Sequence, residues 1–332
     1  MRPKTSTNRG AVELPLTYVY AVLIGIVIFI VATRVIAVQG QSADDRNTEQ
    51  MLSFFDSMIE GFAQNPNTIQ SYQAPRADVR LDWEDHTRII VGRGSSPLRI
   101  PVFSERRLGP DLTAWTYPYN VETASSPLLF LSDGSITYRI ANLTPQASGA
   151  RMDISNEIPA RAATYGLTIP QGSGFAGGAD TRELCIGDLG TSWFGCQIRF
   201  VSKQTPYGYL SWGDDWHPIV SYGELFSALF AAGEDEWKSA ISSARARDRV
   251  NREVLIGRAQ LFKDSEVIAG TCDPHYQGAI GNLTVIKTTI AGLSTENPPV
   301  DLDAFDPIPS AITNLTQIDR TLTRHDCPAV IR

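Results

Sequence analysis

The sequence predicts an α+β protein in which an N-terminal transmembrane helix is followed by a mixed sheet and helix extracytoplasmic domain. Three observations predict it: an uncharged apolar stretch near the start, short β-like runs over residues 75–205, and helical periodicity over residues 206–332. A β-rich part followed by a helical part favours α+β over a regular βαβ alternation. The 332 residues, 42% of them hydrophobic, suit one large domain or two modest ones with a packed core.

The transmembrane prediction rests on residues 14–38, which follow a short basic leader at residues 1–13. From Leu14 to Thr33 the chain carries no charge, and these 20 residues would span about 30 Å as a helix, the thickness of a bilayer's hydrocarbon core. Basic side chains precede the span and only Glu13 opposes them, which favours a cytoplasmic N-terminus. We therefore expect a single-pass protein of the cell membrane with an extracellular C-terminal domain and membrane lipid as a partner.

The four cysteines all lie beyond that span, and no CxxC pair occurs among them. An even number of cysteines at long spacings indicates two disulfides in an oxidising compartment rather than a zinc site. The simplest pairing joins Cys185 to Cys196 and Cys272 to Cys327. The sequence does not choose among the three possible connectivities.

Residues 42–64 are typical of an amphipathic helix or stalk. Ser42 suits the N-cap position, and two acidic residues follow in the first turn. Such a stripe usually covers a domain, and the alternative is a contact with the same helix of a neighbouring copy. The apolar residues that recur at helical spacing are Met51, Leu52, Phe55, Met58, Ile59 and Phe62.

Residues 75–205 form the predicted β-rich part. The runs 127–131 and 135–140 flank Asp133-Gly134, which is a hairpin signal. Residues 172–177 match the G-x-G-x-x-G pattern of dinucleotide sites. That pattern needs a helix whose N-terminus holds the pyrophosphate, and the residues that follow do not suit one. We therefore expect a loop there and no cofactor.

Residues 206–332 form the predicted helical part, with helices from 222 to about 259, over 276–293 and over 308–324. In the first of these helices an apolar stripe runs from Leu225 to Ala244. The charged residues that follow this stripe are expected to face solvent: Arg245, Arg247, Asp248, Arg249, Arg252 and Glu253.

Patterns of catalysis and metal binding are weak in this sequence. The four histidines stand at no metal-ligand spacing, and no G-x-S-x-G nucleophile motif occurs. The net charge of -7 argues against nucleic acid as the main partner. We therefore expect no enzyme activity, no catalytic residue and no metal.

Residues 212–218 are the densest cluster of unusual side chains, and they form the candidate ligand-binding segment. An aspartate and a histidine there could transfer protons, or the tryptophans could stack on a sugar. A tight turn with buried tryptophans explains the same residues and is favoured. The candidate residues are Trp212, Asp214, Asp215, Trp216 and His217.

The stretch from Arg9 to Tyr18 runs directly into the apolar span and resembles the class III signal peptide of archaeal type IV pilin-like proteins. In that family a prepilin peptidase removes a short basic leader and leaves the hydrophobic helix in place. The resemblance implies a cut near Gly10 and makes Glu13 the glutamate that pairs with the new amine of a neighbouring subunit. Prepilin peptidase and other pilin-like subunits would then be partners.

A second, weaker likeness covers about half of the chain. The residues from Ile100 to Ile140 and the late Cys327-Pro328 are similar to a group of uncharacterised archaeal surface proteins, which implies no activity. The sequence therefore favours a pilin-like, non-enzymatic surface protein with a structural, assembly or adhesion role. The alternatives are a monomeric surface module that binds glycans and, third, an exported hydrolase, which would need a further catalytic group beside residues 214–217.

Overall fold

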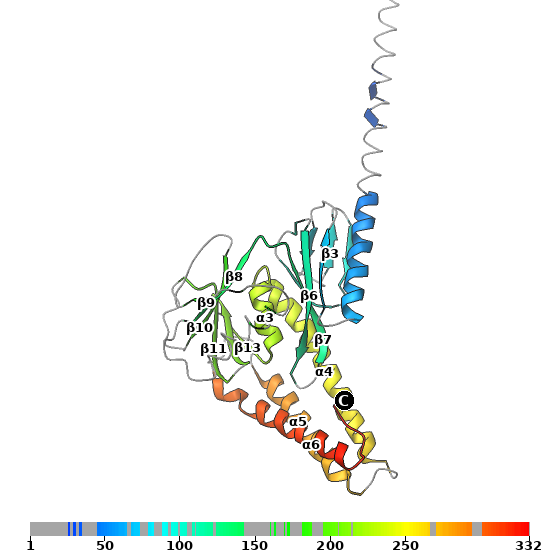
Figure 1. Cartoon of the computed structure of the whole chain (residues 1–332), viewed down its shortest axis with the longest axis vertical. Helices are drawn as coiled ribbons and strands as arrows, with labels where there is room; N and C mark the ends of the chain where they lie inside the picture. The colour runs from blue at the N-terminus through cyan, green and yellow to red at the C-terminus, as the bar shows by residue number, and fades with distance from the viewer. Residues whose placement is uncertain are drawn as a thin grey trace, which may run out of the picture.

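The computed structural model shows three sheets, with helices between the two larger sheets and below them (Figure 1). Figure 1 places α3 between the sheet of β6 and β7 and the sheet of β8, β10 and β11. The structure describes residues 26, 29–30, 33–34, 45–64, 68–73, 79–82, 88–91, 94–98, 100–104, 108–109, 111–121, 124–142, 160, 163, 169, 171–172, 181–187, 195–204, 206–213, 215–265, 270–293 and 301–331.

The first sheet has the strand order β1-β6-β7-β5, in which β5 is parallel to β7 and the other neighbours are antiparallel. Both faces of its central strands are buried because successive side chains enter different cores. Leu128 and Phe130 face α3, whereas Leu129 and Leu131 face the opposite side. The strands are β1 (Ile69–Gln73), β5 (Val102–Ser104), β6 (Asp111–Asn120) and β7 (Ala124–Ser132).

The helix over residues 45–64 covers the outer face of this sheet together with a three-stranded sheet of order β2-β3-β4. The helix packs closely on β4, since a Cβ at Gly94 would lie only 2.7 Å from Cγ2 of Thr48. Its apolar stripe, including Phe55 and Phe62, is buried within the chain, which confirms the prediction that the stripe covers a domain. The strands are β2 (Val79–Asp82), β3 (Arg88–Val91) and β4 (Gly94–Pro97).

The second sheet has six strands in the order β13-β12-β11-β10-β8-β9. The pairs β11/β10, β10/β8 and β8/β9 are parallel, and β12 and β13 extend the sheet as antiparallel strands. The strands are β8 (Thr137–Asn142), β9 (Gln171–Gly172), β10 (Thr181–Gly187), β11 (Ile198–Gln204), β12 (Tyr207–Trp212) and β13 (Asp215–Ile219).

The predicted fold class is wrong in two respects. The protein is mixed α/β, because parallel strands and the helix α3 between the sheets build its centre. Within the described ranges, none of the helices is both long and apolar enough to cross a membrane. The longest of them, α4, has 30 residues but carries many charged side chains. The leader 1–13 and most of the predicted span 14–38 lie outside the described residues.

The predicted hairpin around Asp133-Gly134 is also wrong. The turn exists, with Gly134 at a φ of 77°, and Asp133 Oδ1 accepts the backbone N–H of Ser135 at 2.9 Å. The strands on its two sides nevertheless belong to different sheets: β7 pairs with β6 and β5, and β8 pairs with β10 and β9. The Asp-Gly signal correctly predicts the turn, but long-range pairing decides which strands become neighbours.

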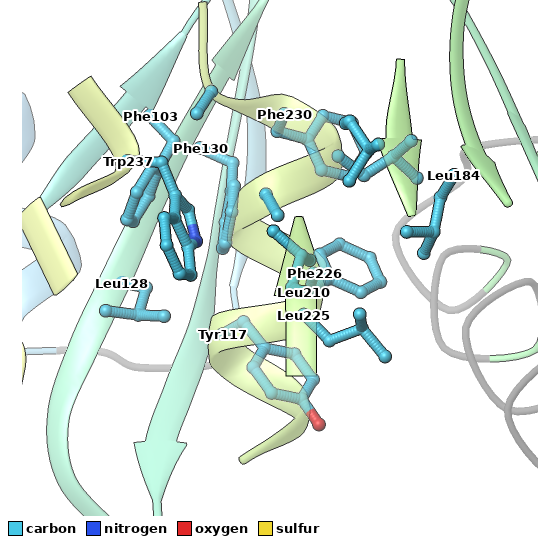
Figure 2. Close-up of a cluster of buried hydrophobic side chains, with 14 of the residues drawn as sticks. Phe103, Tyr117, Leu128, Phe130, Leu184, Leu210, Leu225, Phe226, Phe230 and Trp237 are labelled. Carbon is cyan, nitrogen blue, oxygen red and sulfur yellow. The ribbon is translucent and has the colours of Figure 1, made fainter. Parts of the chain in front are cut away.

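The remaining helices follow the strands and include a short 3-10 turn. Phe226 and Phe230 of α3 contact Phe130 of β7, with ring centroids 5.6 and 5.5 Å apart, and the surrounding apolar side chains fill the space between the sheets (Figure 2). The first half of α4 joins this core, and its second half packs with α5 and α6 in a separate cluster. These elements are α3 (Tyr222–Phe230), α4 (Glu234–Lys263), α5 (Asp273–Gly292), η1 (Leu302–Phe305) and α6 (Pro307–Arg324).

All four cysteines are paired in the way that the sequence suggested as simplest. Cys185 bonds to Cys196 across the connection between the parallel strands β10 and β11, and Cys272 at the start of α5 bonds to Cys327 beyond α6. Next to the second disulfide, Asp319 of α6 accepts the backbone N–H of Val330 at 2.8 Å. The C-terminal end is therefore fixed to the helical cluster by a covalent bond and a hydrogen bond.

Candidate functional site

The core between the two sheets encloses a carboxylate, Glu224, in the first turn of α3. Ser221 is the N-cap, and its Oγ accepts the N–H of Glu224 at 3.2 Å. Glu224 in turn accepts the N–H of Val220 through Oε2 at 2.7 Å. This is a capping box whose glutamate reaches one residue further back than usual, and it leaves Oε1 free for other partners.

Two side chains from other elements donate to Oε1 of Glu224. The Tyr119 hydroxyl of β6 lies at 2.8 Å and Nε of Arg245 on α4 at 2.6 Å. Burial raises the pKa of Tyr119 well above its ordinary value, and the charge of Glu224 raises it further. Burial lowers the pKa of Arg245, but the charge and hydrogen bond of Glu224 together with those of Tyr119 outweigh it, so the net shift is upward. Arg245 is therefore charged and Tyr119 neutral at physiological pH.

A second ion pair lies next to this group. Asp248 and Arg252 of α4 are 4% and 2% exposed and bond to each other one helical turn apart. Asp248 lies about one turn of α4 after Arg245, and its charge also raises the pKa of Tyr119. Two carboxylates and two guanidinium groups thus balance inside the protein. The prediction that Asp248 and Arg252 face solvent is wrong, since their opposite charges neutralise each other in the interior.

A pocket of about 410 Å³ opens beside this network, between β13 and the first half of α4. Its lining combines apolar and cationic side chains. Most of them belong to α4, where residues three to four positions apart lie on the same face of the helix. The described residues that line it are His217, Trp237, Lys238, Ile241, Ser242 and Arg245.

His217 forms the β13 side of the pocket and is held by α4. Its Nε2 lies 3.0 Å from Oε1 of Glu234, and the same oxygen is 2.7 Å from Nζ of Lys238. Lys238 also lies 3.9 Å from Asp215. Burial lowers the pKa of His217, while the hydrogen bond with Glu234 opposes that shift. A neutral His217 must carry its proton on Nε2 to donate to the carboxylate, which fixes the tautomer.

The structure separates the other residues of the predicted ligand-binding segment. Trp212 pairs with Asp215 and lies on the face of the hairpin that packs against the α3 core, together with His217. Trp216 pairs with Ser211 and lies on the opposite face, against the cluster that includes η1. The two tryptophans therefore do not form one stacking surface. Asp214 lies outside the described residues.

The structure describes few of the remaining residues that the sequence singles out as candidates. Gly10, Glu13 and most of residues 172–177 lie outside the described part of the chain, and Gly172 ends the short strand β9. Over the ranges that the structure covers, no group of three or more His, Cys, Asp or Glu side chains is arranged to hold a metal ion.

Sequence reasoning missed Glu224, Arg245 and Tyr119. One signal was present, because Ser221 and Glu224 fit the S-x-x-E capping box that begins many helices. The pattern predicts a cap but not a buried charge, since it says nothing of the arginine 21 residues later that neutralises it.

Comparison of the chain with family models, curated proteins and solved structures gives no match. Function is therefore argued from the residues and their geometry.

Proposed function

We propose that the chain is a pilin-like surface protein with a structural, assembly or adhesion role in an oxidising compartment. The observation that carries the proposal is the pairing of all four cysteines in two disulfides. Such bonds form and persist outside the reducing cytosol. They staple the parallel-strand crossover and the C-terminal helices, which suits a protein that must survive unprotected outside the cell.

The way the helix over residues 45–64 joins the body supports a structural role. Its buried stripe and the hydrogen bond from Ser96 Oγ to Asp56 Oδ1, at 2.8 Å, bind it firmly to β4 and the sheets beneath. A force applied to the chain on the N-terminal side of this helix would therefore be transmitted directly to the core of the sheets.

Exposed apolar side chains near the start support assembly with other subunits. Ile26, Phe29 and Ile30 are helical, are spaced to share one face, and leave half or more of their surface uncovered. Apolar surface of this kind favours contact with another apolar surface. The leader pattern around Gly10 and Glu13 supports neighbouring pilin-like subunits as the partners in that contact.

Mass spectrometry of the mature N-terminus in the native host tests the proposal. We expect the chain to begin just after Gly10 and its four cysteines to resist thiol labelling without reduction. An intact Met1 together with reactive thiols would refute it. A Glu13→Ala variant should be clipped but fail to assemble, whereas a Glu60→Ala variant, changed at an exposed site on helix 45–64, should assemble normally.

Ligand binding is a second candidate, favoured by the pocket between β13 and α4. Lys238 and Arg245 offer cationic groups and Ser242 offers a hydroxyl beside apolar surface, which suits a small anionic molecule such as an acidic sugar. Titration calorimetry with glucuronate and glucose should show binding of the acid alone. A Ser242→Phe variant should abolish that binding by filling the pocket, and unchanged binding by this variant would reject the site.

A further inference from the structure

In the second half of α4, the distribution of buried and exposed side chains is the opposite of that in an ordinary surface helix. It buries Asp248 and Arg252, yet on the opposite side Val250, Val254 and Leu261 are 54%, 63% and 74% exposed. Single exposed apolar residues are ordinary. Here three of the eight large apolar side chains that the structure shows exposed fall on one helix within 12 residues.

These residues form one continuous stripe, defined here as Val250, Val254, Gly257 and Leu261. They follow one another at spacings of four, three and four, which is the pattern of the seam in a two-stranded coiled coil. The opposite side of the helix, including Ala259, packs against α5 and α6. In Figure 1 this half of α4 projects below the sheets, and α5 and α6 lie along one side of it.

Charges beside the stripe determine which partner fits it. In heptad terms Val254 and Leu261 take position a, Val250 and Gly257 take position d, Glu253 takes g and Arg258 takes e. Across a parallel pair of such helices, each g residue faces the e residue five positions later on the partner. Glu253 of one copy would thus face Arg258 of the other, twice by symmetry.

An antiparallel pair does not gain these contacts, because it brings g against g and e against e. With the stripe paired over its full length, Glu253 would face Gln260, and Arg258 would face Asn251. Only the parallel direction therefore gives the stripe opposite-charge pairs with a second copy.

We propose that this stripe is a docking surface for a second copy of the chain, in parallel and in register. The helix is already folded against α5 and α6, so docking requires no ordering of the backbone and a short seam can suffice. The intramolecular ion pair of Glu253 with Lys287, at 3.1 Å, is exposed and leaves the carboxylate accessible to a second cation. Copies that extend from the same cell surface, as the proposed function has them, would meet in this parallel orientation. The rest of the proposal does not depend on that function.

Single-cysteine crosslinking of the purified full chain tests both contact and direction. All native cysteines are paired, so an introduced thiol is the sole target for a short bismaleimide. Val250→Cys and Leu261→Cys, at the two ends of the stripe, should each give a covalent dimer with itself. An antiparallel pair would instead crosslink only a mixture of the two variants, which would overturn the proposal. Val285→Cys on α5, exposed but outside the stripe, is the control and should give no covalent dimer.

Charge exchange gives an independent readout by sedimentation. Glu253→Arg and Arg258→Glu should each weaken the dimer about tenfold, because two like-charged pairs replace two opposite ones. The double variant should restore it. A dimer that neither single variant weakens, or a wild-type chain that never dimerises at micromolar concentration, would refute the proposal without bearing on the leader or on the N-terminal segment.

Discussion

Arg245 donates from Nε to Oε1 of Glu224 at 2.6 Å, and this bond connects α4 to the capped start of α3 inside the protein. The same carboxylate also accepts from Tyr119, so three elements meet at one side chain. Burying these charges gains little stability over an apolar core, but breaking the pair leaves a charge with no counter-charge.

Glu224→Gln should therefore destabilise the protein by about 2–4 kcal/mol, because it leaves Tyr119 and the partly buried Arg245 beside a neutral amide. The double variant Glu224→Gln, Arg245→Met should recover much of that loss. Denaturant unfolding of the oxidised protein measures both. Glu253→Gln, at an exposed ion pair, is the matched control and should change stability by less than about 1 kcal/mol. Equal effects of Glu224→Gln and Glu253→Gln would contradict this account of the network.

The two disulfides should differ in their contribution to stability because they close loops of different length. Cys272–Cys327 spans 55 residues and Cys185–Cys196 spans 11. The chain-entropy relation gives about 4 kcal/mol for the first bond and about 3 kcal/mol for the second. Replacing both cysteines of a pair by serine, one pair at a time, and comparing the free energies of unfolding checks this order. A larger loss from the shorter loop would show that native packing near β10, rather than loop entropy, decides the effect.

Lowering the pH should decrease the free energy of unfolding through the protonation of His217. Its pKa is lowered in the folded protein, so below the unfolded value of about 6.5 the unfolded state takes up protons first. The stability contribution of neutral His217 is therefore complete above about pH 6.5 and is lost as the pH falls through the folded pKa. Glu234, Lys238 and Asp215 are the charged groups near this ring.

Unfolding free energies at pH 7.5 and 5.5 test this expectation, with His217→Gln as the diagnostic variant. The glutamine should reduce the difference between the two pH values, because one titrating group is removed. His325→Gln, near the C-terminus and distant in sequence from the pocket, serves as the control for the other histidines. A pH difference that His217→Gln leaves unchanged would show that carboxylates alone govern the acid sensitivity.

Local patterns in the sequence predicted local structure well. The stripe from Met51 to Phe62 and the stripe of α3 that includes Phe226 are buried as their spacing indicated. A helical period needs no knowledge of distant residues, because the buried face is set by the spacing alone. The cysteine pairs were also accessible to sequence reasoning, since a short loop and a C-terminal tie form the simplest arrangement.

The sequence alone could not predict which distant strands pair with one another. The turn at Asp133-Gly134 looks the same whether its strands pair or separate into two sheets. Paired residues of the parallel neighbours β8 and β10 are 44 positions apart in the sequence, and the apolar runs do not reveal which strand lies beside which. Asp248 and Arg252 were misplaced for a related reason, because a charged residue is assigned to the surface unless its buried partners are known.

Helix 45–64 offers the sharpest comparison of two adjacent positions. Phe55 is fully buried in the core beneath the helix, whereas its neighbour Phe54 is only partly buried and packs edge-on against Phe55 and Tyr72. Phe55→Ala should cost about 3–5 kcal/mol through lost burial and a residual cavity, and Phe54→Ala clearly less. The two variants share chemistry and helix propensity, so the difference in unfolding free energy isolates burial. If the stripe instead served contacts between copies, Phe55→Ala would leave the isolated protein as stable as the wild type and change only its association.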